Sequence, residues 1–227
     1  MKLALFLLSI TSLIAQETPS SIGAFTSLKI QDGLNVTLIS SEENRIQISG
    51  ERKDFVTVTN KDGKLKLRMK TPKKLGGFNT NIELFYNQRI EKIDATEGAF
   101  VSSNDVFMQP SILLSARKGG EIDLSLDVQK ATYKAFTGGK ITTKGSAKVQ
   151  QIQITTGGVV QSQQVDSEQT QASLSGGGVS DISASTIVQI KTKFGGYVRV
   201  HGKPAQLEHS RFLGGNVTIV APSQQDE

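Results

Sequence analysis

The chain repeats a pair of glycines at a fixed spacing. The pairs begin at six positions, each 19 residues after the last: Gly119, Gly138, Gly157, Gly176, Gly195 and Gly214. An imperfect earlier copy begins at Gly98, 21 residues before the first of them. A repeat of constant length indicates one structural unit per copy, stacked on the next. The repeat therefore predicts a solenoid rather than a closed globular core.

A second column of residues accompanies the glycines. Three positions after the first glycine of every pair, the chain has a β-branched residue: Ile122, Ile141, Val160, Val179, Val198 and Val217. Such residues suit strands, so we expect this column to form an inward ladder in the core. The glycine pair fits a tight corner that requires positive φ, and coils of this kind stack at about 4.8 Å.

Other repeat families do not fit these residues. A leucine-rich repeat needs several leucines and an asparagine at fixed places, which the copies lack, and a hexapeptide β-helix needs a different period. A calcium-binding nonapeptide repeat needs G-G-x-G-x-D, but its fourth position is Ile or Val here. The predicted fold is all-β: a right-handed parallel β-helix, or solenoid, with about 19 residues per coil.

The N-terminal segment predicts export. Lys2 precedes an apolar run over residues 3–14 that ends at the small residue Ala15. This pattern is typical of a secretory signal peptide over residues 1–15, cleaved near Ala15, and the run is too short for a membrane-spanning helix. We expect a secreted, periplasmic or cell-surface protein. At the other end, residues 221–227 read as a polar tail.

Between the leader and the coils lies a segment of short strands. Residues 22–97 alternate apolar and polar positions and contain two turn signals, Asp32-Gly33 and Asp62-Gly63, the second flanked by strands as in a hairpin. Since the end of a solenoid needs capping, we expect this β-rich segment to cap the β-helix coils of residues 98–220 and to continue their sheets.

These features resemble the family described as putative autotransporter adhesin, head GIN domain. The resemblance lies in the leader, the opening segment 25–28, the Gly33-Leu34-Asn35-Val36 motif, the hairpin at residues 62–67 and the serial glycine coils. It covers residues 22–220. The resemblance implies a secreted β-helical domain with an adhesive or cell-envelope role, and it carries over no catalytic residues.

Composition excludes several chemistries. The 227 residues contain no cysteine, no tryptophan and two histidines, His201 and His209, with a net charge of +5. A disulfide framework, a thiolate metal site and a histidine-based triad therefore lack their residues. We predict no cofactor, no metal and no catalytic residue, and the scarcity of aromatic residues disfavours nucleic acid as a partner.

The most basic segment is a candidate binding strip. Alternation over residues 64–70 places four cations on one face of a strand: Lys64, Lys66, Arg68 and Lys70. One interpretation is a strip for an acidic polysaccharide or another anion. The other, which we favour, is a solvated face whose lysines discourage edge-to-edge pairing.

Residues 150–185 are rich in Gln, Ser and Thr. They form either a glycan-binding surface or a face that is simply solvated.

One cluster of carboxylates and one single carboxylate are candidates for catalysis. Glu121, Asp123 and Asp127 share one face of a strand, but their counterparts one coil later are not acidic, so no acidic wall is expected. Asp181 follows Val179 by two and is therefore expected to point inward. One interpretation is a catalytic carboxylate with a raised pKa. The other, which we favour, is that the strand bends locally and the carboxylate forms hydrogen bonds with Ser162 or the backbone.

The sequence supports three functions. The first is an exported, non-enzymatic β-solenoid, an adhesin or envelope-binding module with a polar repeat surface whose partner is a glycan, an envelope polysaccharide or a surface protein. The second is a polysaccharide-active lyase or hydrolase of the β-helix type. The third is a structural subunit that assembles through the ends of its solenoid. We expect no transmembrane segment in the mature chain.

Overall fold

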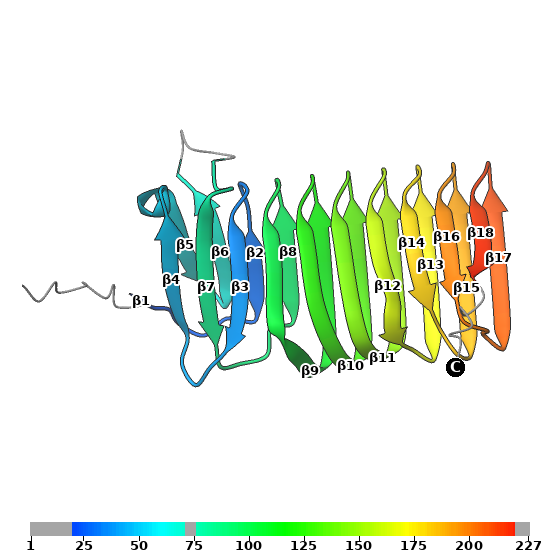
Figure 1. Cartoon of the computed structure of the whole chain (residues 1–227), viewed down its shortest axis with the longest axis horizontal. Helices are drawn as coiled ribbons and strands as arrows, with labels where there is room; N and C mark the ends of the chain where they lie inside the picture. The colour runs from blue at the N-terminus through cyan, green and yellow to red at the C-terminus, as the bar shows by residue number, and fades with distance from the viewer. Residues whose placement is uncertain (1–19, 71–75, 221–227) are drawn as a thin grey trace, which may run out of the picture.

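The computed structural model describes residues 20–70 and 76–220. The predicted signal peptide, its cleavage site and the polar tail lie outside these residues. The described chain is a flat, elongated β-solenoid in which strands stack side by side along one axis (Figure 1). The predicted parallel β-solenoid with coils of about 19 residues is confirmed.

Each coil contributes one strand to each of two facing sheets. Three long strands, β9 (Phe100–Arg117), β10 (Glu121–Phe136) and β11 (Lys140–Thr155), bend and supply their first half to sheet 1 and their second half to sheet 2. Besides these halves, sheet 1 contains β1 (Ser20–Ser21), β4 (Arg45–Gly50), β7 (Thr80–Tyr86), β3 (Asn35–Ser40), β12 (Val159–Asp166), β14 (Val179–Ser183), β16 (Tyr197–His201) and β18 (Asn216–Val220).

Sheet 2 runs the same length behind it. Besides the second halves of β9–β11, its members are β5 (Val56–Lys61), β6 (Lys64–Met69), β2 (Ser27–Ile30), β8 (Lys92–Thr96), β13 (Gln169–Ser175), β15 (Ile187–Lys193) and β17 (Gln206–Phe212). A short 3-10 helix, η1 (Lys53–Phe55), precedes β5. The inward side chains of the two sheets form one continuous core of buried Leu, Ile, Val and Ala.

The N-terminal strands do not stack in sequence order. The coil made by β2 and β3 lies between the coil of β6 and β7 and the coil of β8 and β9 (Figure 1). Three antiparallel pairings close this end: β1 with β4, β4 with β7, and β5 with β6. The predicted Asp62-Gly63 hairpin joins β5 and β6, whereas Asp32-Gly33 forms a coil corner that joins β2 in sheet 2 to β3 in sheet 1.

The two glycines of a pair have different roles. At the corner between β10 and β11, Thr137 and Gly138 both have positive φ, +48° and +71°, which is the conformation of a type I′ turn. A Cβ on Gly138 would meet nothing, but a Cβ on Gly139 would lie 2.0 Å from the carbonyl oxygen of Ala116 in the preceding coil. The first glycine therefore serves the turn, and the second allows the coils to approach. These corners form the upper row of turns in Figure 1.

One coil is a residue longer than the 19-residue repeat, because the register shifts between Thr142, which pairs with Gln161, and Lys144, which pairs with Gln164. Gly176 takes the turn position that Thr156 holds one coil earlier, so Val160 pairs with Ser180 and not with Val179. The next coil is one residue shorter and restores the alignment, since Ser180 pairs with Val198. The predicted valine ladder is therefore wrong at one point: Val179 is half-buried on the outer face, and Ser180 occupies the core position.

Among the described residues, no helix has the length and hydrophobicity needed to cross a membrane.

Candidate binding face

The outer face of sheet 2 carries side chains in rows parallel to the solenoid axis. Parallel register sets the members of a row side by side at about 4.8 Å. The Thr132 row consists of Lys61, Lys64, Ser27, Lys92, Leu113, Thr132, Gln151, Gln171, Gln189 and Glu208. The Lys134 row consists of Thr59, Lys66, Lys29, Asp94, Ser115, Lys134, Gln153, Ser173, Lys191 and Ser210.

A third row, toward the glycine corners, completes this face. The Phe136 row contains Thr96, Arg117, Phe136, Thr155, Ser175, Lys193 and Phe212. Arg68 of β6 lies two residues beyond Lys66 on the same strand face, and so extends this third row toward the cap. The three rows together give a flat surface about ten strands long.

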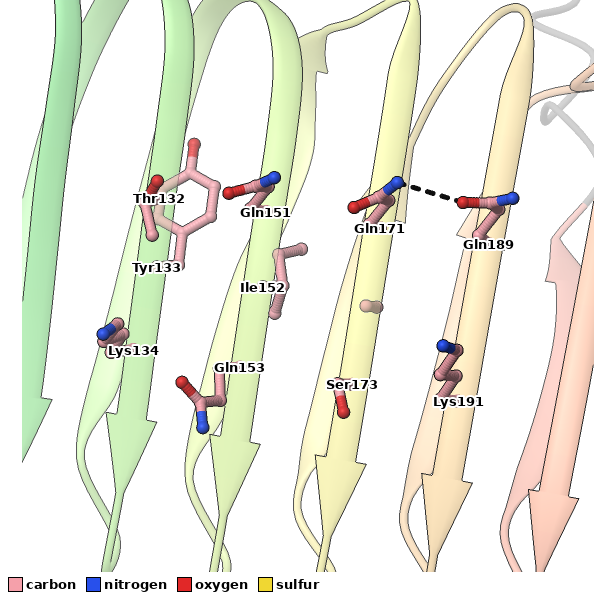
Figure 2. Close-up of a pocket in the computed structure, with 11 residues that line it drawn as sticks. Thr132, Tyr133, Lys134, Gln151, Ile152, Gln153, Gln171, Ser173, Gln189 and Lys191 are labelled. Atoms are coloured by element: carbon pink, nitrogen blue, oxygen red, sulfur yellow. Dashed lines mark hydrogen bonds between the residues drawn. The ribbon is translucent and has the colours of Figure 1, made fainter.

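A shallow groove of about 410 Å³ crosses four strands of this face. Its rim carries three amide side chains in one row, Gln151, Gln171 and Gln189 (Figure 2). The Gln171 Nε2 donates to the Gln189 Oε1 at 3.0 Å, and the Gln189 Nε2 donates to the Glu208 Oε2 at 2.9 Å. These hydrogen bonds orient the amides of Gln171 and Gln189.

Two lysines border these amides. Lys134 on β10 and Lys191 on β15 lie in the neighbouring row, on either side of Gln153 and Ser173 (Figure 2). Most side chains that line this groove donate or accept hydrogen bonds, and the two apolar ones, Ile152 and Ala172, are buried. The groove therefore offers polar contacts to a ligand with hydroxyl or carboxylate groups.

The candidate basic strand forms the cap end of the same face. Lys64, Lys66 and Arg68 project outward from β6, while the alternate residues of this strand are buried. Lys70 follows the strand, and its Nζ donates to the backbone oxygen of Asp54 at 2.9 Å. The first three cations share the outer face of sheet 2 with the glutamine groove, whereas Lys70 is held by the η1 segment.

The structure adds cations that the sequence did not single out. Lys29 of β2 lies directly beside Lys66, and Lys61 of β5 directly opposite Lys64. Lys92 of β8 continues the Thr132 row on the other side of Ser27. Lys29 and Lys92 lie far from Lys64 and Lys66 in the sequence, and the insertion of the β2–β3 coil brings them together.

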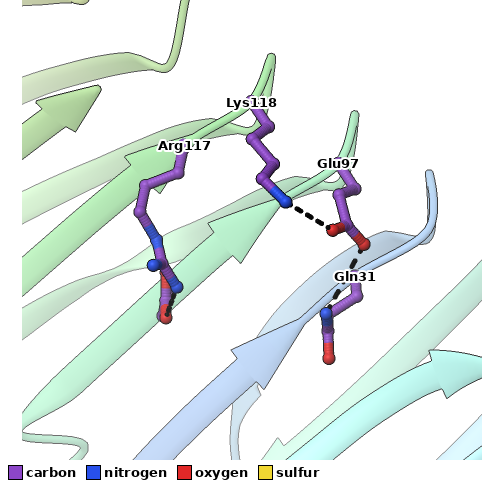
Figure 3. Close-up of polar contacts among 5 residues, drawn as sticks. Gln31, Glu97, Arg117 and Lys118 are labelled. Carbon is purple, nitrogen blue, oxygen red and sulfur yellow. Dashed lines mark hydrogen bonds and ion pairs between the residues drawn. The ribbon is translucent and has the colours of Figure 1, made fainter. Parts of the chain in front are cut away.

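Two ion-pair groups mark the glycine edge of this face. Arg117 binds Asp94 with two hydrogen bonds, Nε to Oδ1 at 3.2 Å and Nη2 to Oδ2 at 2.7 Å. At the next residue, Lys118 Nζ lies 3.2 Å from Glu97 Oε1, and the Gln31 Nε2 lies 3.5 Å from the other carboxylate oxygen (Figure 3). The hydrogen bond from Lys118 is the main cause that holds the pKa of Glu97 below its usual value.

Asp181 corrects the prediction made for it. The one-residue shift puts it in the outward row, between Gln161 and Arg199, yet its side chain is only 4% exposed. Arg199 covers it with a bidentate ion pair, including Nη2 to Oδ2 at 2.7 Å, and the His201 Nε2 lies 3.3 Å from Oδ1.

The charge partners of Asp181 decide its ionisation. Burial raises the pKa of this carboxyl, but the hydrogen bonds from Arg199 and His201 outweigh burial, so the net pKa lies below its ordinary value. The idea of a catalytic carboxylate with a raised pKa is therefore wrong. The Ser162 hydroxyl does contact this residue, but it donates to the Asp181 backbone oxygen, at 3.3 Å.

Sheet 1 gathers carboxylates at the corner opposite the glycines. Glu121, Asp123 and Asp127 all point outward from β10, opposite Lys140, Thr142 and Ser146, so no acidic wall forms between these two coils. A shift in register between Thr142 and Lys144 then places Asp166 opposite Ser146. Asp127 and Asp166 thus line one groove of about 710 Å³ together with Glu168, and all three side chains are exposed.

The histidines have local partners. His201 contacts Asp181, and the His209 Nε2 lies 3.1 Å from the Thr192 Oγ1. Over residues 20–70 and 76–220, no group of three or more His, Cys, Asp or Glu side chains is arranged to hold a metal ion.

Fold and surface together define a class: a two-sheet β-solenoid repeat protein with extended flat faces. The model of the family described as "Putative auto-transporter adhesin, head GIN domain" matches residues 24–204. The chain belongs to this family, as its glycine coils and Gly33-Leu34-Asn35-Val36 motif predicted. No curated protein matches the sequence significantly.

Solved structures share the fold at low sequence identity. A putative adhesin from Bacteroides fragilis has a TM-score of 0.79 and 18% identity, over 89% of this chain and 95% of that chain. A putative adhesin from Parabacteroides distasonis has a TM-score of 0.71 and 14% identity, over 90% and 95%. A putative lipid binding protein from the same species has a TM-score of 0.63 and 12% identity, over 89% and 95%.

Proposed function

We propose that this chain is an exported, non-enzymatic β-solenoid that acts as an adhesin or envelope-binding module and binds a glycan through the outer face of sheet 2. One observation carries the proposal: the in-register row Gln151, Gln171 and Gln189, bordered by Lys134 and Lys191, in a groove open along the axis. Family membership supports the adhesive role, and the predicted leader supports export.

The mechanism follows from the repetition. Each coil offers one amide or hydroxyl to the ligand, and each such contact contributes about 1 kcal/mol. A polymer that lies along the axis meets the same kind of contact at every coil, so many weak contacts add up through an effective concentration. Neither a cofactor nor a catalytic group is required for binding of this type.

A glycan array with the mature chain tests the proposal. The variant Gln151→Ala/Gln171→Ala removes two amides of the groove and should lower binding of the selected glycan at least ten-fold. Gln161→Ala/Gln164→Ala is the matched control, since it removes two amides from β12 in sheet 1. The proposal fails if the array selects no glycan, or if both double variants weaken binding equally.

The acidic groove of sheet 1 favours a second function, cleavage of a polysaccharide. Asp127 and Asp166 lie two coils apart, about 10 Å between backbones, which is near the separation of the two carboxylates in inverting glycosidases. Their exposure disfavours it, because a general acid is usually made by burial. Release of new reducing ends by the chain, lost in Asp127→Asn and Asp166→Asn, would replace the binding proposal with this one.

A further inference from the structure

The cations of the molecule are concentrated on one of its two faces. The three rows of sheet 2 contain only two carboxylates, Asp94 and Glu208, against ten basic side chains: Lys29, Lys61, Lys64, Lys66, Arg68, Lys92, Arg117, Lys134, Lys191 and Lys193. The excess of basic over acidic side chains in these three rows is larger than the net charge of +5 for the whole chain. The remainder of the sequence is therefore net acidic.

Sheet 1 does not share this surplus. Its outward cations are Arg45, Lys140, Lys144 and Arg199, and its outward carboxylates are more numerous: Glu83, Glu121, Asp123, Asp127, Asp166 and Asp181. The two faces of the slab thus differ in charge although both are built from the same repeat. A polyanion in solution meets an attractive face only on sheet 2.

The basic side chains of sheet 2 are available to a ligand. None of the ten is buried, and within the described residues only Arg117 takes part in an ion pair. They also extend in one direction: Lys66 and Lys191 of the Lys134 row are seven strand spacings apart, about 34 Å along the axis.

From this distribution we infer that the ligand is a linear acidic polysaccharide, with carboxylates along its length, that lies parallel to the solenoid axis on sheet 2. The inference rests on the proposed function and names its substrate class. Lysines contact the carboxylates of the polymer, while the interleaved amides and hydroxyls of Gln151, Gln171 and Ser173 contact its hydroxyl groups.

The same face disfavours the other common polyanions. The Thr132 and Lys134 rows contain no aromatic side chain, and the two in the Phe136 row, Phe136 and Phe212, lie four strand spacings apart. Single-stranded nucleic acid is usually held by stacking of successive bases on aromatic residues. The only apolar member of the Thr132 and Lys134 rows is Leu113, which is half-buried, so these two rows offer no side chain that inserts into a lipid layer. An array of lysines interleaved with amides suits a hydroxylated polymer best.

The test measures binding of polygalacturonate, with dextran as the neutral polymer. Lys134→Glu/Lys191→Glu should weaken polygalacturonate binding ten-fold or more at low salt, since each cation near an anionic surface contributes about 1 kcal/mol. Lys140→Glu/Lys144→Glu changes the net charge equally but on sheet 1, and should change binding less than two-fold. Trigalacturonate should bind far more weakly than the polymer.

Each outcome decides something different. Should the sheet 1 variant weaken binding as much as the sheet 2 variant, or should single-stranded DNA or phosphatidylglycerol vesicles bind more tightly than polygalacturonate, the inference is overturned while glycan binding survives. Should neither polymer nor any array glycan bind, the proposed function itself fails. If the glutamate variants unfold, Lys134→Gln/Lys191→Gln gives the same comparison with a smaller expected loss.

Discussion

Arg199 on β16 covers Asp181 on β14, the strand directly beside it in sheet 1, with two hydrogen bonds to its two carboxylate oxygens. Arg117 covers Asp94 in the same bidentate way on sheet 2. In both pairs the carboxylate is nearly buried and the guanidinium partly exposed. Each sheet therefore contains one place where an outward carboxylate is sealed against water by the arginine of a later strand.

The first pair predicts acid sensitivity. Because the pKa of Asp181 is lower in the folded than in the unfolded chain, its contribution to the free energy of unfolding is complete above the unfolded pKa of about 3.9 and is lost as the pH falls through the folded pKa. Asp181→Asn should therefore lower stability by about 2 kcal/mol at neutral pH, and the deficit should shrink below about pH 4. Thermal unfolding at pH 7 and pH 3 measures both values.

Asp123→Asn is the matched control for this variant. Asp123 lies in the same outward row of sheet 1, but it is exposed and has no ion-pair partner among the described residues. It should change stability by less than about 0.5 kcal/mol at either pH. A deficit in Asp181→Asn that stays constant from pH 7 to pH 3 would contradict the ion-pair explanation.

A buried hydroxyl without a partner predicts a stabilising substitution. Ser180 is fully buried between Val160 and Val198, and its Oγ makes no hydrogen bond. Ser180→Ala removes this unsatisfied group and should raise the free energy of unfolding by about 1 kcal/mol. Ser162→Ala should have the opposite sign, because the Ser162 hydroxyl, equally buried, donates to the Asp181 backbone. Chemical denaturation of the two variants checks the prediction, and equal signs would refute it.

The glycine pair predicts an order of two alanine substitutions. Gly138→Ala meets no atom but forces alanine to a φ of +71°, at a cost of about 1 kcal/mol. Gly139→Ala places a Cβ against the backbone oxygen of Ala116, which cannot rotate away, and should cost about 3 kcal/mol or more. Melting temperatures of the two variants test this order; an equal loss would show that both glycines serve only the turn.

Periodicity predicted the coils because their length is written directly in the glycine spacing. It failed at residues 176–178, because the register shift between Thr142 and Lys144 adds one residue to the coil before them and three glycines in a row hide this shift. The register of the neighbouring strands shows which glycines form the turn, since Gly176 occupies the first turn position, as Thr156 does one coil earlier. Val179 and Asp181 were consequently placed on the wrong side of the strand, because a shift of one residue exchanges the two faces.

The candidate face was less predictable than the fold. The alternation in β6 correctly indicated that Lys64, Lys66 and Arg68 share one side of a strand. No local pattern shows that Lys29 lies beside Lys66, because β3, β4 and β5 lie between β2 and β6 in the chain and the pairing joins residues far apart in sequence. The glutamine row is visible in the sequence only once the coil register is known.

The register also determines which deletion removes one complete coil. Val149 pairs with Gln169, so one turn of the solenoid spans 20 residues at this point rather than 19. Deletion of residues 150–169 should leave a folded chain one coil shorter, because inward Gln150 is replaced by inward Thr170. Deletion of residues 150–168 instead sets Gln169 at an inward position and turns the buried side chains of β13 toward water. Cooperative thermal unfolding should survive in the first chain and not in the second, and equal behaviour of both would contradict the strand register on which every row of the candidate face depends.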